Sequence, residues 1–334
     1  MNLPLMLHIV VTAALLGAGG LGCDHTKPSA ATRPGIAATS PALSRFEYSQ
    51  IYMGVRTRLV VYASDETAAV NACRAAFKRV GQVEDAASDY RKDSELMKLC
   101  ATAATRPIRL SDDLYTLLTT AQEISRRTDG AFDITVGPYV LLWRAARKNK
   151  TLPDPAELAA ASKLVGWQKL QIDPATRSAR LTVSGMKLDL GGIAKGYAGD
   201  CALQTLREHG INSALFEAGG DIVVSDAPPG EAGWKIEPED PGPDTPKLLT
   251  LHNCAVSTSG DTQQFVEIGG KHYSHVVDPH TGIGLTTRAM ATVVAPKGLW
   301  SDPLSKPAAM LPRAKLDELL KQYPGTVAYP RVLK

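Results

Sequence analysis

The sequence predicts an α+β fold. Its strands come as hairpins, its helices stand as separate units, and no internal repeat is visible along the 334 residues. A strict alternation of strands and helices would instead indicate a doubly wound parallel sheet. The length suits one large domain or two ordinary ones.

Export signals occupy the N-terminus. Leu3 to Leu16 is an apolar run, which small residues and then Cys23 follow. The run is too short to span a bilayer and is typical of a signal peptide, here residues 1–22. Leu21-Gly22-Cys23 resembles a lipoprotein processing site, and Asp24 resembles an inner-membrane retention signal. The sequence therefore predicts an exported lipoprotein that faces the periplasm and is anchored to the inner membrane, with several acyl chains for stable attachment.

The folded domain begins after a tether. Residues 23–44 are rich in Ala, Pro, Ser and Thr and have no apolar period, which predicts a flexible segment ahead of a domain over 45–334. Residues 46–63 alternate as a strand pair that turns at Gly54, and residues 66–85 have the apolar spacing of an amphipathic helix.

The middle of the chain predicts a second helix over 114–128. This helix ends at Asp129-Gly130, so that Phe132-Asp133 lies just past its C-terminus. Further predicted elements are a short helix over 155–165, strands near 170–172 and 179–183, and a proline-rich loop over 226–247 around a short strand at 234–236.

A change from strand to helix at a pair of glycines is the most informative local feature. Residues 186–190 alternate as a half-buried strand, Gly191 and Gly192 break it, and a helix pattern runs over 193–209. Adjacent glycines let a ligand approach the backbone, and a helix N-terminus offers N–H groups to an anion. Lys195 adds a cation in the first turn, where the helix dipole does not favour one. Two interpretations are open: an anion site, or a tight turn with a surface lysine.

Charge and cysteine usage narrow the class of protein. There are 37 Lys and Arg against 34 Asp and Glu, with no basic stripe interleaved with aromatics, so no nucleic-acid partner is indicated. Four cysteines of the domain lack metal-finger spacing; they are Cys73, Cys100, Cys201 and Cys254. Two disulfides are possible in an oxidising periplasm, but the helical patterns around Cys73 and Cys201 favour buried free thiols.

Several motifs together resemble one family. They are Met53-Gly54, Ser88 to Leu96, Thr128 to Pro138, Lys187 to Ala198, Ser257 to Gly260 and Tyr273 to Gly282. Their order resembles that of the ApbE family, bacterial flavin transferases that move FMN from FAD onto a threonine of an acceptor protein. The resemblance runs from about Tyr48 to Met310 and rests on the ordered set, since any one motif alone would be weak. It implies an ApbE-like, T-fold-related α+β body with an FAD cleft, and an acceptor redox protein as partner.

The implied reaction needs neutralisation of phosphate charge, and Mg²⁺ suits that task. By resemblance, the carbonyl oxygen of Gly192 and the carboxylate of Asp302 would be metal ligands. Lys306 stands where the family has a threonine ligand, and a protonated lysine cannot coordinate a metal. Ser305 could supply a hydroxyl ligand instead, or Lys306 could take the place of the cation. Pro307 removes a helix N–H and disfavours helical geometry at Lys306, so both an intact and a weakened metal site are open.

His275 is the candidate acid–base residue. Histidine titrates nearest to neutral pH, and the resemblance gives a catalytic role to the histidine of Ser274-His-Val-Val-Asp-Pro279, with Asp278 orienting the turn. The alternative is a histidine that satisfies loop backbone. His272 and His280 flank it, but no separate ligand group accompanies them, so zinc is not indicated.

The resemblance also implies residues around the flavin ring. Met53 would lie against the isoalloxazine, because its thioether is soft and polarizable. Tyr90 would stack on a ring system of the flavin, with a buried core tyrosine as the alternative. Ala131 and Phe132 would line the pocket, and Asp133 would accept hydrogen bonds from the flavin or ribose.

A second group would face the rest of FAD. Asp189 would accept hydrogen bonds, Lys195 would face phosphate, and the hydroxyls of Thr258 and Ser259 would lie near the pyrophosphate. Three functions are consistent with these residues: transfer of FMN to an acceptor threonine, binding of FAD without transfer, and hydrolysis of FAD to FMN and AMP.

Overall fold

The computed structural model describes residues 42–260 and 265–333. The expected signal peptide, Cys23 and nearly all of the tether lie outside the described residues. Within those residues, none of the helices has both the length and the apolar character needed to cross a bilayer.

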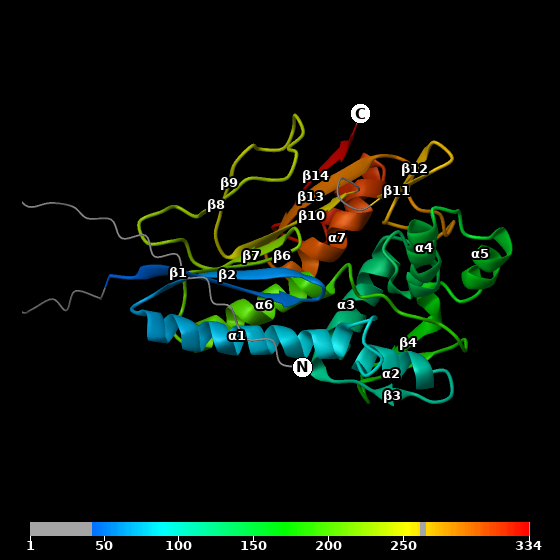
Figure 1. Cartoon of the computed structure of the whole chain (residues 1–334), viewed down its shortest axis with the longest axis horizontal. Coiled ribbons are helices and arrows are strands. Elements are labelled where there is room, and N and C mark those ends of the chain that lie inside the picture. Colours follow the sequence, from blue (N-terminus) through cyan, green and yellow to red (C-terminus); the bar gives the residue numbers. More distant parts are fainter. Residues whose placement is uncertain (1–41, 261–264, 334) are drawn as a thin grey trace, which may run out of the picture.

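A seven-stranded sheet forms the centre of the molecule, and each neighbouring pair of its strands is antiparallel (Figure 1). In order across the sheet, the strands are β1 (Ser44–Tyr52), β2 (Val55–Ala63), β6 (Ala214–Ala218), β7 (Asp221–Val224), β10 (Cys254–Gly260), β13 (Ala289–Ala295) and β14 (Val327–Val332). The structure therefore confirms an α+β fold built largely from antiparallel neighbours.

Three helices cover one face of this sheet: α1 (Glu66–Ala87), α6 (Ala194–Glu208) and α7 (Gly298–Met310). Successive strand residues point to opposite faces, so Leu59 and Phe216 pack with Phe77 of α1. Val60 faces the other way, where Trp234 packs with it. That opposite face is covered in part by the hairpin of β8 (Trp234–Ile236) and β9 (Leu249–Leu251).

The remaining elements lie beside one end of the large sheet (Figure 1). They are α2 (Glu95–Thr102), β3 (Ile108–Arg109), α3 (Asp112–Arg127), the 3₁₀ turns η1 (Ile134–Val136) and η2 (Trp167–Lys169), α4 (Gly137–Asn149), α5 (Pro155–Ser162), β4 (Leu170–Asp173), β5 (Ser178–Leu181), β11 (Phe265–Ile268), β12 (Lys271–Ser274) and α8 (Arg313–Leu320). Strands β3, β5 and β4 form a small sheet, and β11 pairs with β12.

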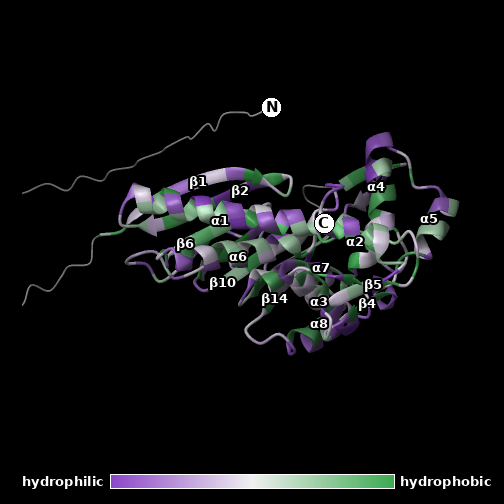
Figure 2. Cartoon of the chain, turned by 90° about the horizontal axis from the view of Figure 1, so that it is seen from below, coloured by the Kyte–Doolittle hydropathy of each residue, from purple (hydrophilic) through white to green (hydrophobic). Residues whose placement is uncertain are grey.

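Most predicted elements are confirmed, because local signals place them. Met53 (φ 51°) and Gly54 (φ 74°) both have positive φ, as the two-residue turn of a tight hairpin requires. The side chain of Asp65 accepts a hydrogen bond from the N–H of Ala68 and so caps α1. Figure 2 shows polar and apolar residues interleaved along α1, as expected of a helix with one buried face.

The predicted strand over 186–190 is wrong. Its alternating burial is real, since Met186, Leu188 and Leu190 are buried. Among the residues that the structure describes, this segment is not part of any sheet, and the N–H of Asp189 donates to the carbonyl of Ile134 (2.8 Å). It crosses the interior against loop and helix backbone, which the alternation alone could not distinguish from a sheet strand.

Pro307 does not interrupt its helix, contrary to expectation. The α7 helix runs from Gly298 to Met310 with Pro303 and Pro307 inside it. The four cysteines of the described domain are free thiols, so the disulfide alternative is excluded there. Cys73 and Cys100 are buried, as predicted for Cys73, whereas Cys201 is half-buried.

Candidate functional site

The glycine turn leads into α6 beside the N-terminus of α7. Gly191 and Gly192 follow Leu190, whose carbonyl accepts a hydrogen bond from the N–H of Ile193 (3.1 Å). A Cβ atom at Gly192 would lie 3.1 Å from Cε of Lys306. The missing side chain at Gly192 therefore makes room for the lysine stem from α7.

Backbone contact between two glycines brings α6 and α7 together. A Cβ at Gly196 would lie only 2.1 Å from the carbonyl oxygen of Gly298. Conversely, a Cβ at Gly298 would lie only 2.2 Å from the carbonyl oxygen of Gly196. Asp200 of α6 then caps α7 by accepting hydrogen bonds from the N–H groups of Gly298 (2.7 Å) and Leu299 (2.8 Å). These contacts set the position of every side chain in the first turns of α7.

A buried carboxylate, Asp302, lies between two lysines at this helix crossing. Its side chain is 0 % exposed; one carboxylate oxygen pairs with Nζ of Lys306, and the other lies 3.8 Å from Nζ of Lys195. Lys195 also lies 3.1 Å from the carboxylate of Asp221, the first residue of β7. These four residues are called the lysine–aspartate cluster below.

The opposite charges within the cluster stabilise the ionised forms of Lys195 and Asp302. Burial alone would raise the pKa of Asp302, but Lys195 and Lys306 hold that pKa below its usual range. Burial alone would lower the pKa of Lys195, but Asp221 and Asp302 raise it above its ordinary value. Burial, and next the charge of Asp302, raise the pKa of Asp221. Lys195 and Asp302 are therefore charged at neutral pH.

The hydroxyls near the cluster belong to two faces of the sheet. Oγ of Ser257 lies 2.8 Å from Oγ of Ser301 on α7, so Ser257 and, two residues on, Ser259 face α7. Thr258 faces the other side, where its hydroxyl lies 3.0 Å from that of Thr292. The structure thus brings Ser259 to the side of the cluster and places the side chain of Thr258 away from it.

The predicted flavin-ring residues come from three segments: the β1–β2 turn, the segment of Tyr90 between α1 and α2, and residues 131–133. Met53 is half-buried in the β1–β2 turn, and its N–H donates to the carboxylate of Glu84 (3.0 Å). Ala131 is half-buried, and Phe132 is buried with its ring 3.4 Å from the Cβ position of Gly192. Phe132 therefore lies at the glycine turn.

Asp133 holds its own turn. Its Oδ1 accepts hydrogen bonds from the N–H (2.8 Å) and the hydroxyl (2.7 Å) of Thr135, and burial raises the pKa of this carboxyl. One of the two carboxylate oxygens that were expected to accept from the flavin or ribose thus already accepts hydrogen bonds within the protein.

Tyr90 is 76 % exposed, so the alternative of a buried core tyrosine is wrong. The guanidinium of Arg144 lies 4.1 Å from the centre of the Tyr90 ring. Arg144 also pairs with Asp89 (2.7 Å) and approaches Asp189 (3.5 Å). Burial, and next the Asp89 charge, raise the pKa of Asp189, and its Oδ1 accepts the N–H of Gly191 (2.8 Å).

His275 lies on a strap, residues 274–285, that folds back on itself after β12. The N–H of Ser274 donates to the carbonyl of Leu285 (2.8 Å). Asp278 orients the turn of the strap, since its carboxylate accepts from the N–H of His280 (2.9 Å) and the hydroxyl of Thr281 (3.0 Å).

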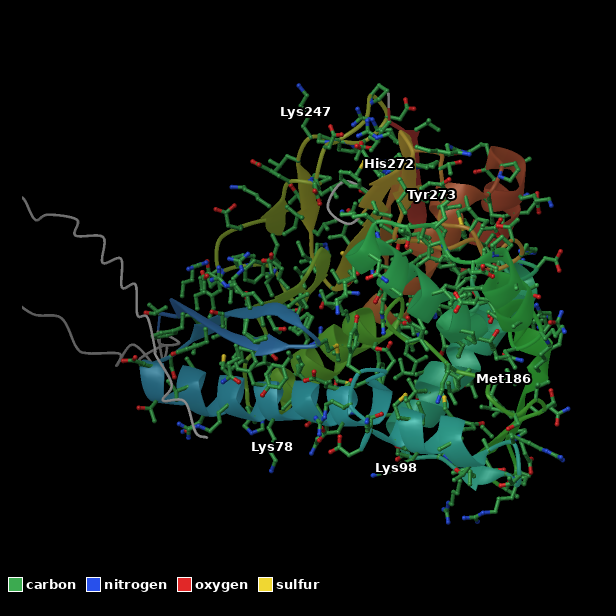
Figure 3. All side chains as sticks on the ribbon, turned by 45° about the vertical axis from the view of Figure 1, so that its right-hand side comes forward. Lys78, Lys98, Met186, Lys247, His272 and Tyr273 are labelled. Atoms are coloured by element: carbon green, nitrogen blue, oxygen red, sulfur yellow. The ribbon has the colours of Figure 1, made fainter. Side chains whose placement is uncertain are left out.

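The strap is held against α4. The indole N–H of Trp143 donates to the carbonyl of Gly282 (2.8 Å), and Tyr273, labelled in Figure 3, packs its ring 5.2 Å from that of Trp143. His275 itself is half-buried. His272 stacks on Phe265 with ring centres 4.5 Å apart.

The donors around Asp302 do not fit Mg²⁺. One carboxylate oxygen pairs with Lys306, and the other accepts the N–H of Gly196 (3.1 Å). The main-chain oxygen of Asp302 accepts both the hydroxyl of Ser305 (2.6 Å) and Nζ of Lys306 (2.9 Å). Mg²⁺ demands oxygen ligands in near-octahedral geometry, and over residues 42–260 and 265–333 no three His, Cys, Asp or Glu side chains gather to hold a metal.

Four residues of this region were not predicted from the sequence: Asp221, Asp200, Arg144 and Glu84. Asp221 follows a second glycine pair, Gly219-Gly220, and a glycine pair is also the signal at Gly191-Gly192. For the other three no local signal exists, because each acts on a residue from a distant part of the chain.

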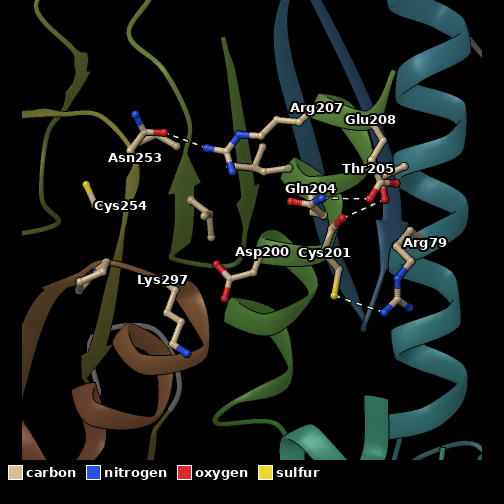
Figure 4. A pocket seen from close by; sticks show the side chains of 14 residues that line it. Arg79, Asp200, Cys201, Gln204, Thr205, Arg207, Glu208, Asn253, Cys254 and Lys297 are labelled. Carbon is tan, nitrogen blue, oxygen red and sulfur yellow. Dashed lines mark hydrogen bonds between the residues drawn. The ribbon is translucent and has the colours of Figure 1, made fainter. Parts of the chain in front are cut away.

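Two surface hollows have none of the four members of the lysine–aspartate cluster among their walls. One, of about 650 Å³, lies along the outer side of α6 between α1 and the start of α7, with Asp200, Cys201 and Lys297 among its walls (Figure 4). The other, of about 850 Å³, borders the small sheet of β3, β5 and β4. Neither is lined by a residue predicted to bind FAD.

The fold and the helix crossing define a protein of the flavin-transferase class. The structure of the Pseudomonas stutzeri flavinyl transferase ApbE, apo form, matches with a TM-score of 0.76 and 27 % identity, covering 88 % of this chain and 92 % of that one. The ApbE protein of Thermotoga maritima matches with a TM-score of 0.76 and 27 % identity, covering 86 % and 94 %.

The chain belongs to the ApbE family, whose model matches residues 53–329. An FAD:protein FMN transferase of Treponema pallidum (strain Nichols) is 31 % identical over 302 residues, which cover 84 % of this chain and 83 % of that protein. One of Klebsiella pneumoniae (strain 342) is 32 % identical over 261 residues, covering 77 % and 79 %.

Proposed function

We propose that this protein transfers FMN from FAD to a threonine side chain of an acceptor redox protein and releases AMP. Family membership supports the reaction class. The observation that carries the proposal is the lysine–aspartate cluster beside the glycine turn. Lys195 at the N-terminus of α6 and Lys306 on α7 are two cations close together, which suits the charge of a pyrophosphate.

The step balances without a further reagent. The threonine oxygen forms a bond to the phosphorus of the FMN half of FAD. The bond from that phosphorus to the bridging oxygen breaks, and AMP leaves with the electron pair on this oxygen. The hydroxyl proton passes to His275 as general base. The chain otherwise positions the groups and neutralises charge on the phosphate oxygens.

FAD would extend from the glycine turn toward the β1–β2 hairpin. Phe132 at the turn and Met53 in the hairpin offer apolar surface to the isoalloxazine. The exposed ring of Tyr90, backed by Arg144, is available for stacking. By resemblance, Mg²⁺ would neutralise charge on the phosphate oxygens; in this chain we assign that task to lysine ammonium groups.

We also propose that the protein works on the periplasmic side of the inner membrane, held by lipid on Cys23. The apolar run, Cys23 and Asp24 of the sequence support this placement. Metabolic labelling with a radioactive fatty acid should mark the wild type but not Cys23→Ser, which should fractionate away from membranes; equal labelling of both would refute the anchor.

The reaction is tested by incubating the purified mature protein with FAD and an acceptor domain, with and without Mg²⁺. Acceptor that gains the mass of FMN, together with stoichiometric AMP, is the expected result. FMN and AMP released without acceptor would indicate hydrolysis, and bound but intact FAD would indicate a carrier. His275→Ala should abolish transfer, whereas the matched variant His272→Ala should retain it.

A further inference from the structure

We propose that the ammonium group of Lys306 takes the place of a divalent cation, so that this chain provides its own fixed charge for the FAD pyrophosphate. The inference deepens the proposed function and rests on it, since it concerns how the same site neutralises the phosphates. The disagreement between the donors around Asp302 and the needs of Mg²⁺ is its starting point.

Lys306 is held in place rather than free on the surface. It lies four residues after Asp302, one turn along α7, and its Nζ contacts both the carboxylate and the main-chain oxygen (2.9 Å) of Asp302. Its stem passes 3.1 Å from the Cβ position of Gly192. The ammonium is therefore fixed beside the glycine turn, and 19 % of the side chain remains exposed.

The hydrogen-bond inventory of this ammonium leaves one donor for a ligand. A lysine ammonium has three N–H donors and no acceptor. Asp302 takes two of them, through one carboxylate oxygen and its carbonyl oxygen. The third is available to a phosphate oxygen, whose charge a metal ion would otherwise neutralise.

A divalent cation would have to displace these contacts. The oxygens of Asp302 already accept from Lys306, from the N–H of Gly196 and from the hydroxyl of Ser305. Ser305 is 0 % exposed and donates its proton into its own helix, so it faces no open space as a metal ligand. A second cation would also meet the like charges of Lys306 and Lys195.

The proposal makes the wild type independent of divalent metal and makes Lys306→Thr dependent on it. Transfer of FMN is measured after removal of metal with EDTA and again with added Mg²⁺. The transfer rate of the wild type should differ by less than about threefold between the two conditions, because its cation is a lysine side chain that EDTA cannot remove. Lys306→Met should lose about 100-fold in EDTA, as for removal of one charge-stabilising donor.

Metal binding supplies a readout apart from activity. Mn²⁺ is titrated into FAD-loaded protein and followed by electron paramagnetic resonance. The wild type and Lys306→Arg should not bind Mn²⁺, whereas Lys306→Thr, which restores a hydroxyl and removes the ammonium, should bind one ion. The exposed Lys78 of α1 (Figure 3) provides the control Lys78→Thr, which should behave as the wild type in both assays.

Stoichiometric Mn²⁺ binding by the FAD-loaded wild type, or loss of its transfer in EDTA, would overturn the proposal. If no condition yields flavinylated acceptor, the proposed function fails, but the Mn²⁺ titrations still decide the role of Lys306. Circular dichroism and thermal melts identify a variant that does not fold, and Lys306→Arg then keeps the test open because it preserves the positive charge.

Discussion

Replacing Gly196 by alanine tests whether the helix crossing positions the site. The new Cβ would lie 2.1 Å from the carbonyl oxygen of Gly298 and 2.8 Å from Cβ of Asp302. Contacts of this type require at least 3.0 Å, so α6 and α7 must separate by about 0.9 Å. Such overpacking costs about 2–3 kcal/mol of unfolding free energy, and the better helix propensity of alanine returns about 1 kcal/mol.

A net loss of about 1–2 kcal/mol corresponds to a fall of about 4 °C in Tm for a domain of this size. Activity should fall further than stability, because Asp302 and the neighbouring Lys195 move with the backbone. A displacement near 1 Å costs about 100-fold in rate where geometry controls the reaction.

The assay combines thermal melts with initial rates of FMN transfer at a temperature where both proteins are folded. Gly81→Ala in α1 is the matched control, since the three atoms nearest to its Cβ all belong to the side chain of Tyr52, the first of them at 3.2 Å. The control should stay within about 1 kcal/mol of the wild type. A Gly196→Ala protein with wild-type Tm and rate would refute the reasoning, because it would show that the two helix backbones are not in contact.

Three further outcomes are expected. Burial raises the pKa of Asp200 to about 6. Between about pH 4 and 6 the folded state therefore binds more protons than the unfolded state, and the free energy of unfolding falls as the pH rises through this range. Denaturation at pH 4 and pH 7 should show a smaller change in stability for Asp200→Asn than for the wild type, and an equal change would contradict this prediction. Arg144→Met removes the guanidinium that pairs with Asp89 and approaches Asp189, and it should cost about 1–2 kcal/mol in urea unfolding. No loss would mean that solvent screens these pairs. Gly282→Ala places a Cβ 2.5 Å from a tyrosine of α4 at a residue with φ 71°, and it should displace the strap that carries His275 and lower the rate of transfer. The control Gly270→Ala has a φ of 72° and no atom within 4 Å of its Cβ, so it carries backbone strain alone. Equal transfer rates for the two variants would rule out an effect through the strap.

Local sequence signals predicted the helices and hairpins well. The apolar spacing over 66–85 became α1, and the alternation over 46–63 became β1 and β2 around the turn at Gly54. These predictions depend on hydrogen bonds and side-chain periods within a few residues of one another, which the order of residues specifies directly.

Long-range contacts account for the failures. Residues 186–190 alternate like a strand, yet the segment is not part of any described sheet. Tyr90 is exposed, and its contact is with Arg144, which lies more than fifty residues away in sequence and stacks on the Tyr90 ring. Pro307 remains helical because it is buried in α7, most of whose residues are buried, and because Asp200 caps the start of that helix.

By itself the sequence determined the α+β class, the family and the unusual lysine at position 306, because each depends on residue identity and order along the chain. Only the tertiary structure decided what that lysine does. The backbone contact of Gly196 with Gly298 places Asp302 between Lys195 and Lys306. A charge acts through distance in space, and α6 and α7 are separated by about ninety residues along the chain, so the sequence could name these groups but could not bring them together.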